Sequence, residues 1–149
     1  MFSDDLDKAL ATFVLANGAA ATGQKVTIFF TFWGLNVIKK LHKPKVEKDI
    51  FGKMIGTKLP SRSQKLKLSN MSMGGRGGKM LRYIMHRKGI DSLESLRQQA
   101  LENGVEFIAC QMSMDVMGVK REELLDEVTV GGVSTYMERA DNDNINLFI

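Results

Sequence analysis

The chain contains a single cysteine, Cys110, at a position where a thiol could act as a nucleophile. The apolar pattern of residues 105–109 predicts a buried strand directly before it, and residues 112–117 are predicted to form a short helix after it. Functional groups of open α/β sheets gather at the carboxyl ends of the strands. A thiol there would face backbone N–H groups and the positive end of a helix dipole, which stabilise the thiolate. The alternative is that Cys110 is an ordinary core residue, because cysteine is among the most buried residue types.

Several side chains are candidates for a pocket around this thiol. Methionine is flexible and polarizable, so the methionines after Cys110 suit a pocket for a large, soft sulfur group, although plain packing explains them equally well. A Cu(I) site of Cys110 and thioethers is a further alternative. One cysteine and two histidines cannot build an ordinary zinc or iron–sulfur site, so we expect no metal and no cofactor. The predicted supporting residues are Thr31, Trp33, Gln111, Met112 and Met114.

A glycine-rich segment opens a predicted helix and could bind an anion. It fails the P-loop pattern, which needs glycine at Met73 and Ser or Thr at Met80. What remains is a segment with free N–H groups and two cations that either contacts an anion or serves as a hinge. The candidate anion-binding residues are Gly75, Arg76, Gly77, Gly78 and Lys79.

Charge is spread unevenly along the chain. Residues 39–67 contain ten Lys or Arg residues and two acidic ones, a net charge of +8, whereas the rest of the chain carries −4, which together give the net charge of +4. This basic excursion, residues 40–70, is either a solvated loop or a surface that steers an anionic partner. We predict that the stretch from Lys39 to Lys67 recruits an acidic partner protein to the Cys110 site, which substitution of Lys43, Lys45 and Lys48 by alanine would test. Nucleic acid is not expected, because Phe51 is the only aromatic residue available for base stacking in this stretch.

The order of elements indicates one α/β domain spanning residues 1–149. Asp91 and Gly104 are expected to cap the helix predicted at residues 92–103 at its two ends. No leader peptide and no membrane-spanning run is evident, so we expect a cytoplasmic protein. A short strand is expected before the first helix, which suggests that the first strand is truncated at the N-terminus. The predicted helices lie near residues 4–23, 35–41, 46–55, 78–88, 92–103, 112–117, 121–125 and 133–140, and the predicted strands at 25–30, 105–109, 128–130 and 145–149.

Four segments resemble the DsrE/DsrF-like sulfur-carrier family, in particular the subgroup often fused to rhodanese, TusA-like or CoA-disulfide-reductase modules. They are residues 3–11 (SDDLDKALA), 29–36 (FFTFWGLN), 109–118 (ACQMSMDVMG) and 146–149 (NLFI). The resemblance extends over nearly the whole chain. It implies a three-layer, flavodoxin-like or Rossmann-like fold with a mostly parallel sheet and helices on both faces.

The resemblance also implies a function. Cys110 aligns with the sulfur-accepting cysteine of the family, so the chain would be a sulfur carrier, or a sulfurtransferase, that holds sulfur as a persulfide or thiosulfonate and relays it to an acceptor thiol. The implied partners are TusA-like or rhodanese-like sulfur-transfer proteins and further copies of the chain. A mechanism with a resolving thiol in the same subunit is in doubt, because the chain has no second cysteine. The alternative is an oligomeric module that binds an anion or coenzyme A without turnover.

Overall fold

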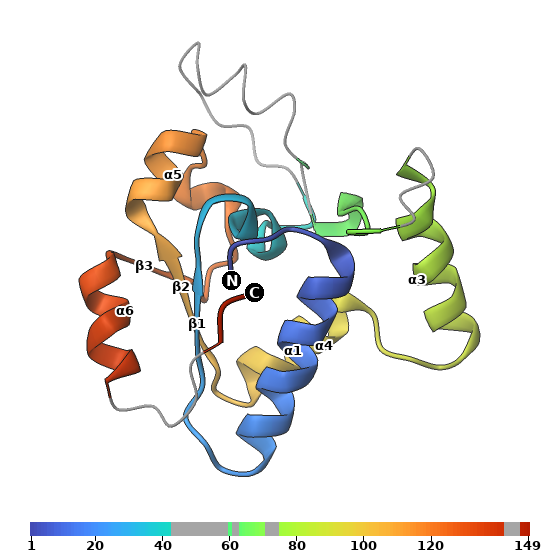
Figure 1. Ribbon diagram of the computed structural model, residues 1–149, viewed down its shortest axis with the longest axis horizontal. Helices are drawn as coiled ribbons and strands as arrows, with labels where there is room; N and C mark the ends of the chain where they lie inside the picture. Colours follow the sequence, from blue (N-terminus) through green and yellow to red (C-terminus); the bar gives the residue numbers. More distant parts are fainter. Residues whose placement is uncertain (43–59, 61–62, 71–74, 142–146) are drawn as a thin grey trace.

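The computed structural model describes residues 1–42, 60, 63–70, 75–141 and 147–149 (Figure 1). The helix predicted near residues 46–55 lies outside these ranges. None of the helices within them is both long and apolar enough to cross a bilayer. The elements are α1 (Leu6–Ala21), β1 (Thr27–Phe30), η1 (Phe32–Ile38), η2 (Ser63–Lys65), α3 (Gly77–Arg87), α4 (Leu93–Glu102), β2 (Glu106–Cys110), α5 (Gln111–Met117), η4 (Arg121–Glu123), β3 (Thr129–Gly131) and α6 (Val133–Ala140).

The three strands form one parallel sheet in the order β1-β2-β3, which makes β2 the central strand. Phe30 pairs with Ala109, and Cys110 pairs with Gly131. Since parallel strands require crossover connections, helices cover the sheet, and the predicted parallel α/β fold is confirmed.

One face of the sheet packs against α1 and α4 (Figure 1). Three fully buried rings join the layers there: Phe13 of α1 lies 6.5 Å from Phe30 and 5.7 Å from Phe107, measured between ring centroids. Asn17 ties α1 to α4, because its side-chain amide donates to the carbonyl of Leu96 at 2.9 Å. This face therefore holds the main apolar core.

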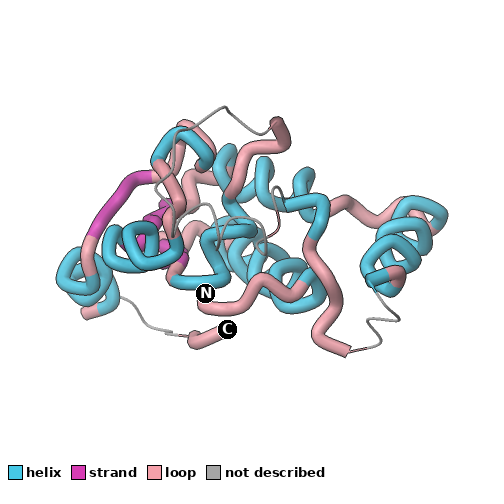
Figure 2. Tube along the Cα trace, turned by 90° about the horizontal axis from the view of Figure 1, so that it is seen from above, coloured by secondary structure: helices cyan, strands magenta, loops and turns pink. Residues whose placement is uncertain are grey.

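The opposite face is covered by α6. Residues of β1 and β2 that alternate with the core residues point this way, since side chains of a strand alternate between its two faces. The ring of Phe29 lies 5.1 Å from that of Tyr136, and Arg139 pairs with Glu106 at 3.1 Å. Figure 2, which looks along the sheet from above, likewise places helices on both sides of the strands. The molecule thus has the expected three layers.

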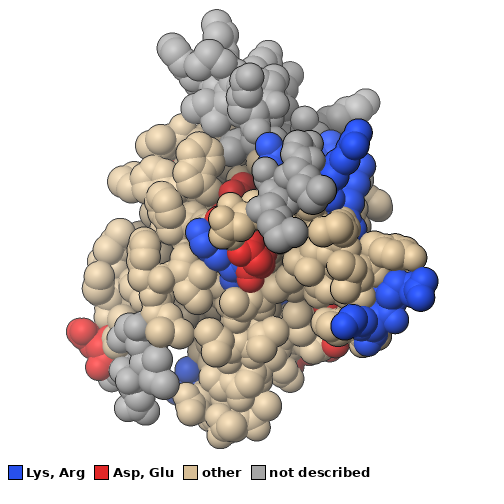
Figure 3. Space-filling view, turned by 45° about the vertical axis from the view of Figure 1, so that its right-hand side comes forward, with Lys and Arg blue, Asp and Glu red and all other residues tan. Residues whose placement is uncertain are grey.

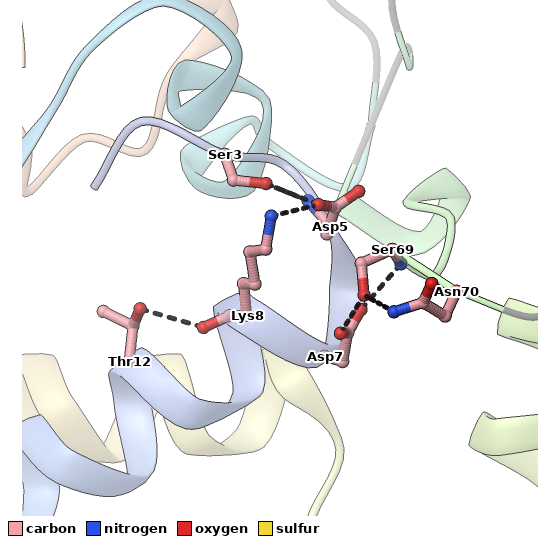
Figure 4. Close-up of polar contacts among 7 residues, drawn as sticks. All are labelled: Ser3, Asp5, Asp7, Lys8, Thr12, Ser69 and Asn70. Atoms are coloured by element: carbon pink, nitrogen blue, oxygen red, sulfur yellow. Dashed lines mark hydrogen bonds and ion pairs between the residues drawn. The ribbon is translucent and has the colours of Figure 1, made fainter. Parts of the chain in front are cut away.

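Polar side chains fix the start of α1 (Figure 4). Asp5 is the N-cap residue, and its backbone N–H donates to Ser3 Oγ at 3.1 Å. Asp5 also pairs with Lys8 at 2.8 Å, while the carboxylate of Asp7 accepts two hydrogen bonds from Ser69. The helix predicted near residues 4–23 is present, although it begins at Leu6, two residues later than expected, and the side chain of its N-cap residue makes no capping hydrogen bond.

Two local predictions are wrong in the described residues, and a third is shifted: the helical segment predicted after β1 is present as a 3-10 helix, η1, that begins at Phe32. Ser92 rather than Asp91 caps α4, because the Ser92 hydroxyl accepts from the backbone of Ser95, and Asp91 lies one residue further from the helix. Residues 147–149 are not in a strand; their contact with the sheet region is a hydrogen bond from the Phe2 N–H to the carbonyl of Ile149.

Met1 lies beside the outer edge of β1 and bonds to it as a residue of a neighbouring parallel strand would. Its amino nitrogen donates to the carbonyl of Phe29 at 2.7 Å, and its carbonyl accepts from the Thr31 N–H at 3.1 Å. This pair of bonds, flanking Phe30, is the pattern of a parallel ladder. The chain therefore runs beside the edge of β1 before it enters α1.

Candidate functional site

Cys110 ends the central strand and is the N-cap residue of α5. Its thiol makes no capping hydrogen bond to the helix. The residue is only 1% exposed. The thiol also borders a cavity, which offers a reactant a route to it.

That cavity has a volume of about 1420 Å³ and lies along β1, between α1 and α6. Every residue of β1 except Phe30 lines it, as do Thr31 and Phe32 after the strand. Cys110 borders the end where the strands finish, and Glu106 borders the end where they begin. The cavity is elongated along the strand direction, with the only cysteine of the chain at one end.

Two helices begin beside Cys110. α5 starts at the next residue, and α6 starts two residues after Gly131, which pairs with Cys110 across the sheet. Gly131 allows a close approach, because an added Cβ would lie 3.1 Å from Ile108 and 3.3 Å from Thr135. Helix N-termini carry partial positive charge, and two of them therefore lie at this edge of the sheet.

The predicted supporting residues fall into two groups. Thr31 and Met112 line the cavity with Cys110. Met114 is 4% exposed and belongs to the hydrophobic core, Trp33 is 44% exposed on η1, and Gln111 donates to Asp115 on the surface of α5 at 2.9 Å. None of these last three residues lines the cavity.

The glycine segment lies elsewhere. α3, which it opens, stands at the end of the molecule away from α6 (Figures 1 and 2). Gly78 is needed for packing, because an added Cβ would lie 2.9 Å from the carbonyl of Leu66. None of the residues 75–79 lines the cavity of Cys110. An anion held by Arg76 and Lys79 would thus lie outside that cavity.

Two lysines of the described part of the basic stretch are engaged within the chain, whereas Lys65 and Lys67 are exposed. Lys39 is 3% exposed and donates to the carbonyl of Pro60 at 3.2 Å, and Lys40 pairs with Asp126 at 2.7 Å. Lys43, Lys45 and Lys48 lie outside the described residues. Lysine and arginine side chains are also gathered on the side of the molecule where α3 lies (Figure 3).

Three residues near Cys110 were not anticipated: Phe29, Tyr136 and Ser113. Phe29 and Tyr136 line the cavity, and the Ser113 hydroxyl lies 2.8 Å from that of Thr31. The alternation along β1 was a usable signal, since Phe29 and Thr31 share a face. The partners on α5 and α6 depend on tertiary packing. Within the described ranges, no three His, Cys, Asp or Glu side chains come together to hold a metal ion.

Comparison with known proteins gives the chain a family. The DsrE/DsrF/DrsH-like family matches residues 1–148. The uncharacterized protein YrkE of Bacillus subtilis (strain 168) is 42% identical over 149 residues, which cover 100% of this chain and 93% of YrkE. The sulfur carrier protein DsrE2 of Allochromatium vinosum is 37% identical over 148 residues, 97% of this chain and 91% of that protein. The resemblance seen in the sequence is confirmed, and the chain belongs to the DsrE/DsrF/DrsH-like family.

Proposed function

We propose that this protein is a sulfur carrier that holds sulfur on Cys110 as a persulfide and passes it to the thiol of a sulfur-transfer partner. The observation that carries the proposal is the placement of the only cysteine at the end of the central strand, on a cavity and beside two helix N-termini. Its relative of 37% identity is named a sulfur carrier protein, which supports the same role.

Loading is an exchange between sulfur atoms. The Cys110 thiolate attacks the outer sulfur of a donor hydropersulfide, R–S–SH. A new S–S bond forms, the donor S–S bond breaks, and the electron pair leaves with R–S⁻. The outer sulfur then releases its proton to solvent, which leaves a persulfide anion on Cys110. No external oxidant or reductant is required.

Unloading uses the same chemistry in reverse. The thiolate of an acceptor attacks the outer sulfur of the Cys110 hydropersulfide, and Cys110 leaves as a thiolate. One cysteine on each protein is sufficient, so the lack of a second cysteine is compatible with a carrier. Because Cys110 is buried, the acceptor must present its thiol on a narrow or flexible segment that can enter the cavity. TusA-like and rhodanese-like proteins remain the partner classes we favour.

Intact-mass spectrometry tests the proposal directly. After incubation with glutathione hydropersulfide, the protein should gain the mass of one or more sulfur atoms, and subsequent addition of a thiol acceptor should remove it. Cys110→Ala is the matched control and should gain nothing, since the chain has no other cysteine. A wild-type protein that gains no sulfur would contradict the carrier role, and a gain equal to a bound glutathione would favour a binding module.

A further inference from the structure

A pair of hydroxyl groups, one buried and one half-buried, joins the end of β1 to the helix that follows Cys110. Thr31 Oγ1 and Ser113 Oγ lie 2.8 Å apart. Thr31 directly follows β1, and Ser113 lies in the first turn of α5, three residues after Cys110. Ser113 is 0% exposed, so solvent cannot serve its hydroxyl.

Burial determines which hydroxyl is the donor. A hydroxyl has one proton to donate and two lone pairs that accept. Among the described residues, Thr31 is the only hydrogen-bond partner of the Ser113 side chain. A buried donor without an acceptor costs about 1–3 kcal/mol, so Ser113 donates and Thr31 accepts. The proton of the Thr31 hydroxyl then has no acceptor within the described part of the chain.

The sheet register places Thr31 beside Cys110. Phe30 pairs with Ala109, so the next residues, Thr31 and Cys110, are neighbours in the following row. Paired residues of neighbouring strands point to the same face, and both residues line the same cavity. Neighbouring strands lie about 4.8 Å apart, and a persulfide extends the side chain by an S–S bond of about 2 Å. The outer sulfur would therefore come within reach of the Thr31 hydroxyl.

The backbone holds Thr31 in place. Its N–H donates to Met1 at 3.1 Å, and its carbonyl accepts from Gly34 at 3.0 Å. Phe32, the next residue, has φ of +48°, a left-handed conformation that is unusual for a phenylalanine. Strained residues of this kind persist where the surrounding structure determines them and are frequent at functional sites. The Thr31 hydroxyl is thus preorganised.

We propose that Thr31, oriented by Ser113, donates a hydrogen bond to the anionic outer sulfur of a persulfide on Cys110 and so stabilises the loaded carrier. The proposal rests on the proposed carrier function. Thr31 keeps its proton and makes no covalent bond. Ser113 is a positioning residue, because it acts only through Thr31.

The test is the exchange equilibrium of each variant with a fixed ratio of glutathione hydropersulfide to glutathione, read as the loaded fraction by intact mass. A hydrogen bond to an anion is among the stronger ones, so Thr31→Val should lower the ratio of loaded to unloaded protein by at least about tenfold. Thr31→Ser should restore it to near the wild-type value. Ser113→Ala should lower the ratio of loaded to unloaded protein by a smaller factor, because the Thr31 hydroxyl remains but is no longer oriented by Ser113.

Thr27→Val is the matched control. Thr27 lies on the same strand and lines the same cavity, but its hydroxyl contacts Glu106 at the opposite end. This variant should load like wild type. If Thr31→Val loads to the wild-type level, or Thr31→Ser fails to restore loading, the role of Thr31 is wrong while the carrier function stands. If Thr31→Val does not fold, a wild-type equilibrium in Ser113→Ala overturns the positioning role. If wild type itself does not load, both proposals fall.

Discussion

A polar contact between the chain start and η1 leaves one buried oxygen without a donor. The side-chain amide of Asn36, which is 1% exposed, donates to Asp4 Oδ2 at 2.9 Å. Among the described residues, Asn36 Oδ1 has no hydrogen-bond partner. Burial raises the pKa of the Asp4 carboxyl above its usual value, an effect that the hydrogen bond from Asn36 and the charge of Lys39 only partly offset. The ionised carboxylate is thus unfavourable here.

We expect Asp4→Asn to stabilise the protein at neutral pH. An amide at position 4 still accepts from Asn36 and also offers an N–H to the unpartnered Oδ1. A buried polar atom without a partner costs about 1–3 kcal/mol, and the loss of the attraction to Lys39 offsets part of the gain. The expected net increase in the free energy of unfolding is about 1 kcal/mol, or about 2–4 °C in Tm for a chain of this size.

The effect should depend on pH in a defined direction. Because the pKa of Asp4 is higher in the folded than in the unfolded chain, its favourable contribution is fully present below the unfolded value, 3.8, and is lost as the pH rises through the folded value. Wild type therefore carries the full penalty at neutral pH, where Asp4→Asn should gain most. The advantage of the variant should shrink as the pH falls toward 3.8.

Urea unfolding of wild type and Asp4→Asn between about pH 7 and about pH 4 measures this difference. Asp5→Asn is the matched control, since it removes the ion pair with Lys8 and fills no unpartnered site; it should bring no gain. A loss of stability in Asp4→Asn at neutral pH, or a gain that grows on acidification, would refute the reasoning.

Two further pairs of substitutions test the core and the backbone. Phe13→Ala removes a ring of α1 that is 0% exposed and packs on Phe30 of β1 and Phe107 of β2, so it should lower the free energy of unfolding by about 3–5 kcal/mol. Phe148 is 84% exposed, so Phe148→Ala should change the free energy of unfolding by less than about 0.5 kcal/mol. Equal losses would contradict the assigned core. Gly118→Ala should cost about 1 kcal/mol or more, because Gly118 ends α5 at φ of +61°. Gly18→Ala should instead stabilise α1 by about 0.5–1 kcal/mol, since an added Cβ there meets nothing within 4 Å. Chemical denaturation measures each, and opposite signs for the two glycines are the decisive result.

Local elements with strong signals could be predicted from the amino-acid sequence. The apolar segment before Cys110 forms β2, and Gly104 and Gly118 follow helices with positive φ, as expected of residues with no Cβ. The position of Cys110 between a strand and a helix followed from these short-range patterns. Such features depend on neighbours in the chain, so they can be predicted without knowledge of the fold.

Other choices were ambiguous locally. Ser92 and Asp91 are both good N-cap residues, and the backbone conformation at Ser92 decides between them. Met112 and Met114 looked equivalent around Cys110, but residues two positions apart point to nearly opposite sides of a helix. Met112 therefore lines the cavity, and Met114 is buried in the core.

The surroundings of the Cys110 thiol depend on long-range packing. Thr31 and Ser113 are 82 residues apart in the chain and meet because β1 and β2 are paired in one register. Tyr136 reaches Phe29 because α6 folds back over the sheet face that Cys110 shares. The glycine segment, which composition alone made a candidate, lies on α3 at the far end of the molecule. Long-range pairing sets these distances, and no pattern within a short segment contains them.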